Sequence, residues 1–322
     1  MEDNALEPAI RARAAARLMV IADLDLDQQL AERTIASSQI LERSSAVTET
    51  HCMRLELVYH TAFGDIDAAE TLAYELLARF PPDSTSTDSI RARNFAGYSL
   101  FRLRYLSAAS RVFEASYDAM CRQTISNQAL YCATLRTEIA ITEGCFDDAH
   151  FWHERARTAA RGGAPHELMP PAGLYANAGL LAMYGGRYDE AEALLFAPAK
   201  DFAMLSADRY RAVSLALAVR LRQISSAQVS GAAELKELLR LYTKGRRLGG
   251  QDSIVEALWS ARVLMGDELG ASALLEEYLH QHRRERGEPD WSLIHTTAAD
   301  DAWQSFAPPR LLHQSPALRT RL

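Results

Sequence analysis

The stretch FGDIDAA, residues 63–69, contains the pattern that decides the fold of this chain. The same arrangement returns as EGCFDDA at 143–149, GGRYDEA at 185–191 and MGDELGA at 265–271. In each copy a large or acidic residue stands two positions after a glycine, and an alanine stands five positions after it. A pattern that returns along a chain in this way is the signature of a repeat protein.

The pattern predicts two antiparallel helices joined at the glycine. Glycine accepts a positive φ without a Cβ clash, so it ends the first helix. The acidic residues that follow lie in the first turn of the second helix, where they cap free N–H groups and oppose the helix dipole. The small alanine lets the two helices approach closely. Ala, Leu, Arg and Glu are abundant and β-branched residues rarely alternate, which also favours helices.

The spacing of the glycines gives the length of the repeat. Gly64, Gly144, Gly186 and Gly266 are separated by 80, 42 and 80 residues. The unit is therefore about forty residues long, and two units lack their glycine. A degenerate copy is predicted around residue 104, a turn at 224–228 and an earlier hairpin near 23–25. The sequence predicts an all-α superhelical array of about seven helix-turn-helix repeats over residues 1–288.

Residues 289–322 form a separate C-terminal segment. A helix is predicted from Asp290 to Phe306, with Trp291, Ile294 and Trp303 as its apolar side chains. The last repeat of an array exposes an apolar face that must be covered, so we expect this segment to be a capping helix and tail. A protruding segment that binds a partner is the alternative.

The repeats resemble the tetratricopeptide (TPR) family, in which small residues, a glycine, an aromatic residue and a proline occupy set positions. Gly179, Gly186, Tyr188 and Ala191 match those positions in one unit, Gly64, Ala69 and Pro81 in a second, and Gly97, Ala109 and Phe113 in a third. The longer period is similar to the superhelical sensor region of MalT-type bacterial transcription activators. Those proteins also carry a nucleotide-binding module and a DNA-binding helix-turn-helix. This sequence has no G-x-x-x-x-G-K-(S/T) motif, and the thirteen residues after Pro309 are too few for a DNA-binding domain.

Composition excludes several other classes of protein. The net charge is -7, from 35 basic and 42 acidic residues, and the densest basic clusters, at 244–247 and 283–286, hold three basic residues each. Direct nucleic-acid binding is therefore not expected. No apolar run is long enough for a membrane span, and no secretory signal follows the acidic N-terminus. Four cysteines without a CxxC pair fit reduced thiols, so we expect a cytoplasmic protein with no membrane partner.

No motif indicates catalysis, a metal or a cofactor. Residues 97–101, GYSLF, lack the closing glycine of a hydrolase elbow. Asp23, Asp25 and Asp27 lack the glycine and glutamate of a calcium loop and fit a capped helix start instead. The cysteine, aspartate and histidines within 145–153 are too few for a zinc site. The sequence therefore predicts a protein that is not an enzyme.

The TPR resemblance implies where a ligand would bind, because the first helix of each unit lines the concave surface in such arrays. Carrying those positions over selects Arg54, Arg91, Asn94, Tyr98, Arg102, Tyr131, Thr134, Asn177, Tyr184 and Arg220. Arginine and tyrosine are enriched at binding hot spots, and four arginines suit an anionic or acidic ligand. The alternative is that these are ordinary solvated helix positions, with Tyr98 and Tyr184 partly in the core.

Four of these residues predict a stripe along one helix. Arg91, Asn94, Tyr98 and Arg102 are spaced by three and four residues, which places them on one side of a helix. We expect the two arginines to be solvated and to contribute little to folding.

The function expected from the sequence is a non-enzymatic interaction scaffold or sensor in bacterial transcriptional regulation or signalling. Its concave groove would bind a peptide, an acidic protein segment or a small effector. The alternative function is a ligand-responsive DNA-binding transcription regulator. A monomer and a homodimer are both compatible with the sequence.

Overall fold

The computed structural model describes residues 8–39, 45–103 except 83 and 85, 105–122, 126–161, 169–195, 208–226, 232–244 and part of 257–276. The regular structure of these residues is helical, and no strand occurs among them, so the predicted all-α class is confirmed. The chain divides into two units, residues 1–181 with 204–209, and residues 182–203 with 210–322. The helix predicted for 290–306 lies outside the described residues. None of the described helices is both long and apolar enough to cross a bilayer.

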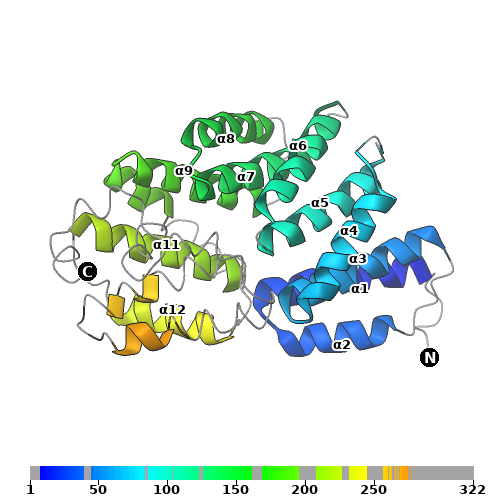
Figure 1. Cartoon of the computed structure of the whole chain (residues 1–322), viewed down its shortest axis with the longest axis horizontal. Helices are drawn as coiled ribbons and strands as arrows, with labels where there is room; N and C mark the ends of the chain where they lie inside the picture. Colours follow the sequence, from blue (N-terminus) through cyan, green and yellow to red (C-terminus); the bar gives the residue numbers. More distant parts are fainter. Residues whose placement is uncertain are drawn as a thin grey trace. The chain divides into compact units, whose positions relative to one another are not determined.

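The first unit is built from consecutive helical hairpins (Figure 1). They are α1 (Pro8–Asp25) with α2 (Gln28–Ser38), α3 (Ala46–Ala62) with α4 (Ile66–Arg79), α5 (Thr87–Arg102) with α6 (Leu106–Arg122), and α7 (Ser126–Thr142) with α8 (Phe146–Arg161). The two helices of each hairpin contact each other. Among the first helices, α1 contacts α3 and α3 contacts α5, while α6 contacts α7. Each hairpin is therefore packed against the next.

The division between the units passes through two further helices. These are α9 (Met169–Tyr184), divided after Leu181, and α11 (Asp208–Ser226), divided after Arg209. The second unit also contains α12 (Ala232–Lys244) and short helical segments between residues 257 and 276. Helices lie on both sides of the turn predicted at 224–228, but α11 continues to Ser226, so the turn does not begin at residue 224; residues 227–231 lie outside the described residues.

The predicted turn glycines have two different roles. Gly144 and Gly186 have φ values of 73° and 76°, which confirms the expectation that they end a helix in the left-handed region. Gly64 does not have a positive φ, so the expectation is wrong there. A Cβ at Gly64 would lie 2.6 Å from His60 Nδ1 and 2.9 Å from the His60 Cα, so close packing of the turn excludes a side chain. Gly266 lies outside the described residues.

The turn between α1 and α2 uses another residue in place of glycine. Leu26 adopts a φ of 55°, and it is the only non-glycine residue with a positive φ among those described. Asp27 then caps α2, because its side chain accepts a hydrogen bond of 2.9 Å from the Leu30 N–H. Asp65 caps α4 through the Ala68 N–H at the same distance. The hairpin predicted near residues 23–25 and the capping role of the acidic residues are both confirmed.

We expect Gly144→Ala to lower the free energy of unfolding by about 1–2 kcal/mol, because a side chain at positive φ is strained. No atom lies within 4 Å of a Cβ built at this glycine, so the cost is conformational and not steric. Gly144→Asn should cost less, since asparagine tolerates this region better than alanine. Urea unfolding of the two variants checks the difference. Equal stability of Gly144→Ala and the unmodified chain would contradict the positive φ.

The repeating alanines are buried. Ala69, Ala109, Ala149 and Ala191 are all completely buried, and Ala271 is 2% exposed. A larger side chain at these positions would push the two helices apart. The burial of these alanines agrees with the small residue predicted at this position of the repeat.

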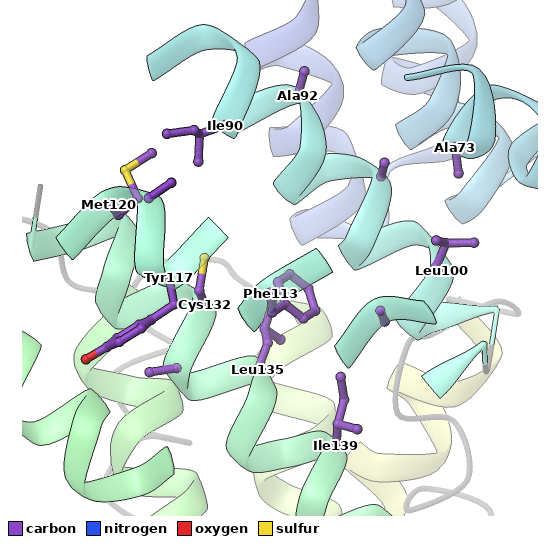
Figure 2. Close-up of a cluster of buried hydrophobic side chains, with 14 of the residues drawn as sticks. Ala73, Ile90, Ala92, Leu100, Phe113, Tyr117, Met120, Cys132, Leu135 and Ile139 are labelled. Carbon is purple, nitrogen blue, oxygen red and sulfur yellow. The ribbon is translucent and has the colours of Figure 1, made fainter. Parts of the chain in front are cut away.

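The hydrophobic core of the first unit continues from one hairpin to the next. Its buried cluster runs from Met53 in α3 to Ala156 in α8. Figure 2 shows Leu100, Phe113 and Ile139, from α5, α6 and α7, within this cluster. A Cβ at Gly97 would lie 3.2 Å from Phe113 Cε1, so α5 lies close against the Phe113 ring.

Candidate binding site

The ten residues predicted to bind a ligand lie on α3, α5, α7, α9 and α11, each of which precedes a turn. Arg54 is on α3, the stripe of four residues on α5, Tyr131 and Thr134 on α7, Asn177 and Tyr184 on α9, and Arg220 on α11. The side chain of Arg220 lies outside the described residues. All ten residues therefore lie on helices that precede a turn, as predicted. The surroundings of each side chain decide what it can bind.

Three of the predicted polar residues are buried between helices. Asn94 donates to Gln128 Oε1 at 3.2 Å and accepts from Cys132 Sγ at 3.5 Å, which connects α5 to α7. Asn177 donates to the Thr134 carbonyl oxygen at 2.8 Å, which connects α9 to α7. Asn94, Asn177 and Thr134 are all buried. The prediction that they line an open surface is therefore wrong, since their contacts lie between helices.

Two of the predicted tyrosines belong partly to the core. Tyr98 packs against Tyr131 with ring centroids 6.4 Å apart, and Tyr131 meets Phe113 edge to face at 6.3 Å. Both tyrosines are half-buried against the hydrophobic cluster of the first unit. Tyr184 on α9 is half-buried as well. The alternative of a partial core role for Tyr98 is therefore correct.

Arg102 is buried in an ion cluster, contrary to the expectation that it is solvated. Its Nη1 lies 2.9 Å from Asp23 Oδ1, and Arg209 pairs with the other oxygen of the same carboxylate. The side chains of Arg102, Asp23 and Arg209 are 4%, 6% and 3% exposed. Both guanidinium groups lie over the Tyr98 ring, at 5.8 and 5.3 Å from its centroid. We call Asp23, Arg102 and Arg209 the ion cluster; it lies within the first unit.

The sequence reasoning missed Asp23 as a buried charge, although a signal was present. The buried residues of α1 include Ala12, Ala16, Met19 and Asp23, which follow one another at helical spacing. A carboxylate on an apolar stripe predicts a buried acid that must have a cationic partner.

Of the other two predicted arginines with described side chains, Arg91 is exposed and Arg54 is half-buried. The Arg54 guanidinium carbon lies 4.3 Å from the centroid of the Phe95 ring, and Nη1 lies 3.5 Å from His51 Nδ1. Its Nε is buried and has no hydrogen-bond partner among the described residues. Burial lowers the pKa of Arg54 to about 10; Asp88 opposes this change, while Arg91 and Arg13 add to it. Arg54 therefore packs against the Phe95 ring and interacts with one carboxylate and two other guanidinium groups.

Arg91 and Arg13 extend this positive region. Arg91 is 42% exposed, and its Nη1 lies 3.8 Å from Asp88 Oδ1, a carboxylate that is itself 74% exposed. Arg13 on α1 is exposed and forms no ion pair with a described residue. Burial lowers the pKa of His51; Arg54 and Arg13 lower it further, and Asp88 raises it. These side chains of α1, α3 and α5 interact electrostatically. We call the set the arginine face; it consists of Arg13, His51, Arg54, Asp88 and Arg91.

The arginine face carries three guanidinium groups and one carboxylate, in a chain whose net charge is -7. A guanidinium group offers a planar set of donors that matches carboxylate and phosphate oxygens. The described residues contain no group of three histidine, cysteine, aspartate or glutamate side chains that could hold a metal ion. What this face can do chemically is attract and hydrogen-bond an anionic group.

Comparison with known proteins assigns no family to the chain. No family model matches it, and no curated protein is significantly similar to it. The TPR-like and MalT-type resemblances therefore stay predictions, and the binding chemistry is inferred from the residues of the arginine face.

Proposed function

We propose that this chain is a non-enzymatic binding protein, a scaffold or sensor whose hairpins form a TPR-like array and whose arginine face holds a partner. The function would be exercised in the cytoplasm, in bacterial transcriptional regulation or signalling. The observation that carries the proposal is the gathering of Arg13, Arg54 and Arg91 on three successive first helices with Asp88 as their nearby carboxylate. Three guanidinium groups beside one carboxylate leave an excess of positive charge that repels itself, so it is more readily explained by binding than by folding.

The positions within the hairpins also support this proposal. The three arginines come from α1, α3 and α5, the first helices of three consecutive hairpins, which contact one another in order. The packing of the hairpins thus presents side chains from distant parts of the sequence on one surface. Arginine is among the side chains that most often dominate binding energy at protein interfaces.

We expect Arg91→Glu to weaken capture of native partners by at least about thirtyfold, the effect of truncating a hot spot worth about 2 kcal/mol. The test is quantitative mass spectrometry of proteins retained from a lysate of the native cell. Folding should be unaffected, because substitutions of exposed residues usually change stability by no more than about 0.5 kcal/mol.

Arg157 on α8 provides a matched control for Arg91. It is 47% exposed against 42%, and it also pairs with an acid three residues earlier, Glu154, at 2.6 Å. Arg157→Glu therefore changes the net charge equally on a helix that does not contribute to the arginine face. Equal retention of partners by the Arg91→Glu and Arg157→Glu variants would contradict the proposed function.

A further inference from the structure

The three guanidinium groups of the arginine face come from three consecutive hairpins and therefore follow one another in a row. Arg13, Arg54 and Arg91 contribute one guanidinium group from each of three hairpins, and α3 contacts both α1 and α5. Packed helices have axes about 8–10 Å apart, and this distance sets the scale of the spacing between side chains on neighbouring first helices. An extended peptide advances about 3.3 Å per residue, so side chains about three residues apart match this spacing. One small anion would span only part of the row.

The middle position of the row is the most organised. Phe95 supports the Arg54 guanidinium from one side, and His51 contacts Nη1 from the same helix. The buried Arg54 Nε lacks a hydrogen-bond partner among the described residues. Asp88 attracts the Arg54 guanidinium, while Arg91 and Arg13, which have the same charge as Arg54, repel it. A bound carboxylate would relieve this repulsion, so the arrangement favours an anion before any ligand arrives.

We propose that the arginine face binds an acidic peptide segment whose carboxylates pair in turn with Arg13, Arg54 and Arg91, and that protonation of His51 strengthens the binding. This inference rests on the proposed function and adds the chemical class of the ligand. It commits to a chain of carboxylates and not to a free phosphate or a nucleic acid, because the charges form a row and the whole chain is acidic.

The direction of the pH effect follows from the groups around His51. Burial, Arg54 of α3 and Arg13 of α1 hold the pKa of His51 below 6.5, while Asp88 of α5 opposes them. These groups therefore favour the neutral imidazole in the free protein. A carboxylate bound nearby favours the protonated ring and raises this pKa, so binding takes up a proton. Affinity for the acidic peptide should increase as the pH falls from 7.5 toward and below the ordinary histidine pKa of about 6.5.

The test is fluorescence anisotropy of the full chain with a labelled peptide of about ten glutamates, long enough to span three helices. A glutamine peptide of the same length is the control for charge. We expect the glutamate peptide alone to bind, and to bind more weakly as salt increases. Arg13→Gln and Arg91→Gln should each reduce the affinity by about tenfold, as expected for loss of one charge-assisted hydrogen bond. Both arginines are accessible, so these variants should fold, as circular dichroism and a melting curve would verify.

The control variants separate this site from general electrostatics. Arg157→Gln removes the same charge outside the arginine face and should leave the affinity unchanged. His51→Gln should remove the increase in affinity at low pH. Equal weakening by Arg157→Gln and Arg91→Gln, or equal binding of the two peptides, would overturn the inference. Binding of inorganic phosphate or duplex DNA by the full chain, without binding of the glutamate peptide, would also overturn the inference.

The two proposals fail in different ways. If partner capture depends on Arg91 but no glutamate peptide binds, the ligand class is wrong and the proposed function stands. If capture is also independent of Arg91, the arginine face is not a binding surface and both proposals are wrong.

Discussion

Asp23→Ala is expected to lower the free energy of unfolding by about 3–5 kcal/mol, the usual cost of removing one partner from a buried ion pair. The substitution leaves Arg102 and Arg209 buried side by side over the Tyr98 ring without the carboxylate that they share. Two cations in a poorly hydrated environment repel each other and have lost their hydration. Urea unfolding followed by circular dichroism measures the loss as a lower midpoint.

The exposed pair of Glu154 and Arg157 is the control for this prediction. Glu154→Ala removes an acid of the same charge from a pair whose side chains are both largely exposed, and such pairs contribute little to stability because water and salt screen them. A further variant with apolar residues at all three positions of the ion cluster should recover much of the loss, since the three buried charges of the cluster are then gone. If Asp23→Ala and Glu154→Ala are equally stable, the ion cluster does not exist in solution.

Phe113→Ala is expected to cost about 3–5 kcal/mol, as large aromatic residues do when truncated in a core. Phe113 is completely buried; its ring contacts Tyr131 edge to face and lies against Gly97. Phe113→Leu keeps most of the volume and should cost less than about 1.5 kcal/mol. Denaturant midpoints of the two variants give the comparison.

Phe151 on α8 serves as a control for the loss of an aromatic ring. It is exposed and lies 4.4 Å from the Arg155 guanidinium carbon, a contact worth about 1 kcal/mol or less. Phe151→Ala should therefore be much milder than Phe113→Ala. Similar losses for the two variants would mean that Phe113 does not lie in a closely packed core.

The local features of the fold could be predicted because they depend on neighbouring residues. Gly144 and Gly186, the capping acid Asp65 and the small residue Ala69 each act within one hairpin, where sequence spacing and spatial proximity agree. Gly64 shows the limit of this reasoning. Its place in the pattern is the same, but its turn requires space beside His60 and not a positive φ.

The candidate site could be predicted only in part, because burial depends on what packs against a helix. Asn94 and Arg102 lie in the same stripe as Arg91, yet one meets α7 and the other meets Asp23 of α1. Spacing within α5 contains no information about those neighbours. Arg13 was not predicted as a binding residue. The other candidates were selected by their distance from a turn glycine, and the turn after α1 has Leu26 in place of a glycine.

The ion cluster has a consequence for the order in which the protein is made. Asp23 and Arg209 are 186 positions apart in the chain. At a synthesis rate of about 5–20 residues per second, Asp23 leaves the ribosome roughly 10–40 s before its second cation. Ordinary repeat arrays depend only on adjacent units and can be shortened from either end. Here the pairing of Asp23 is complete only when residue 209 has been made, so shorter nascent chains can pair this acid with Arg102 but not with Arg209.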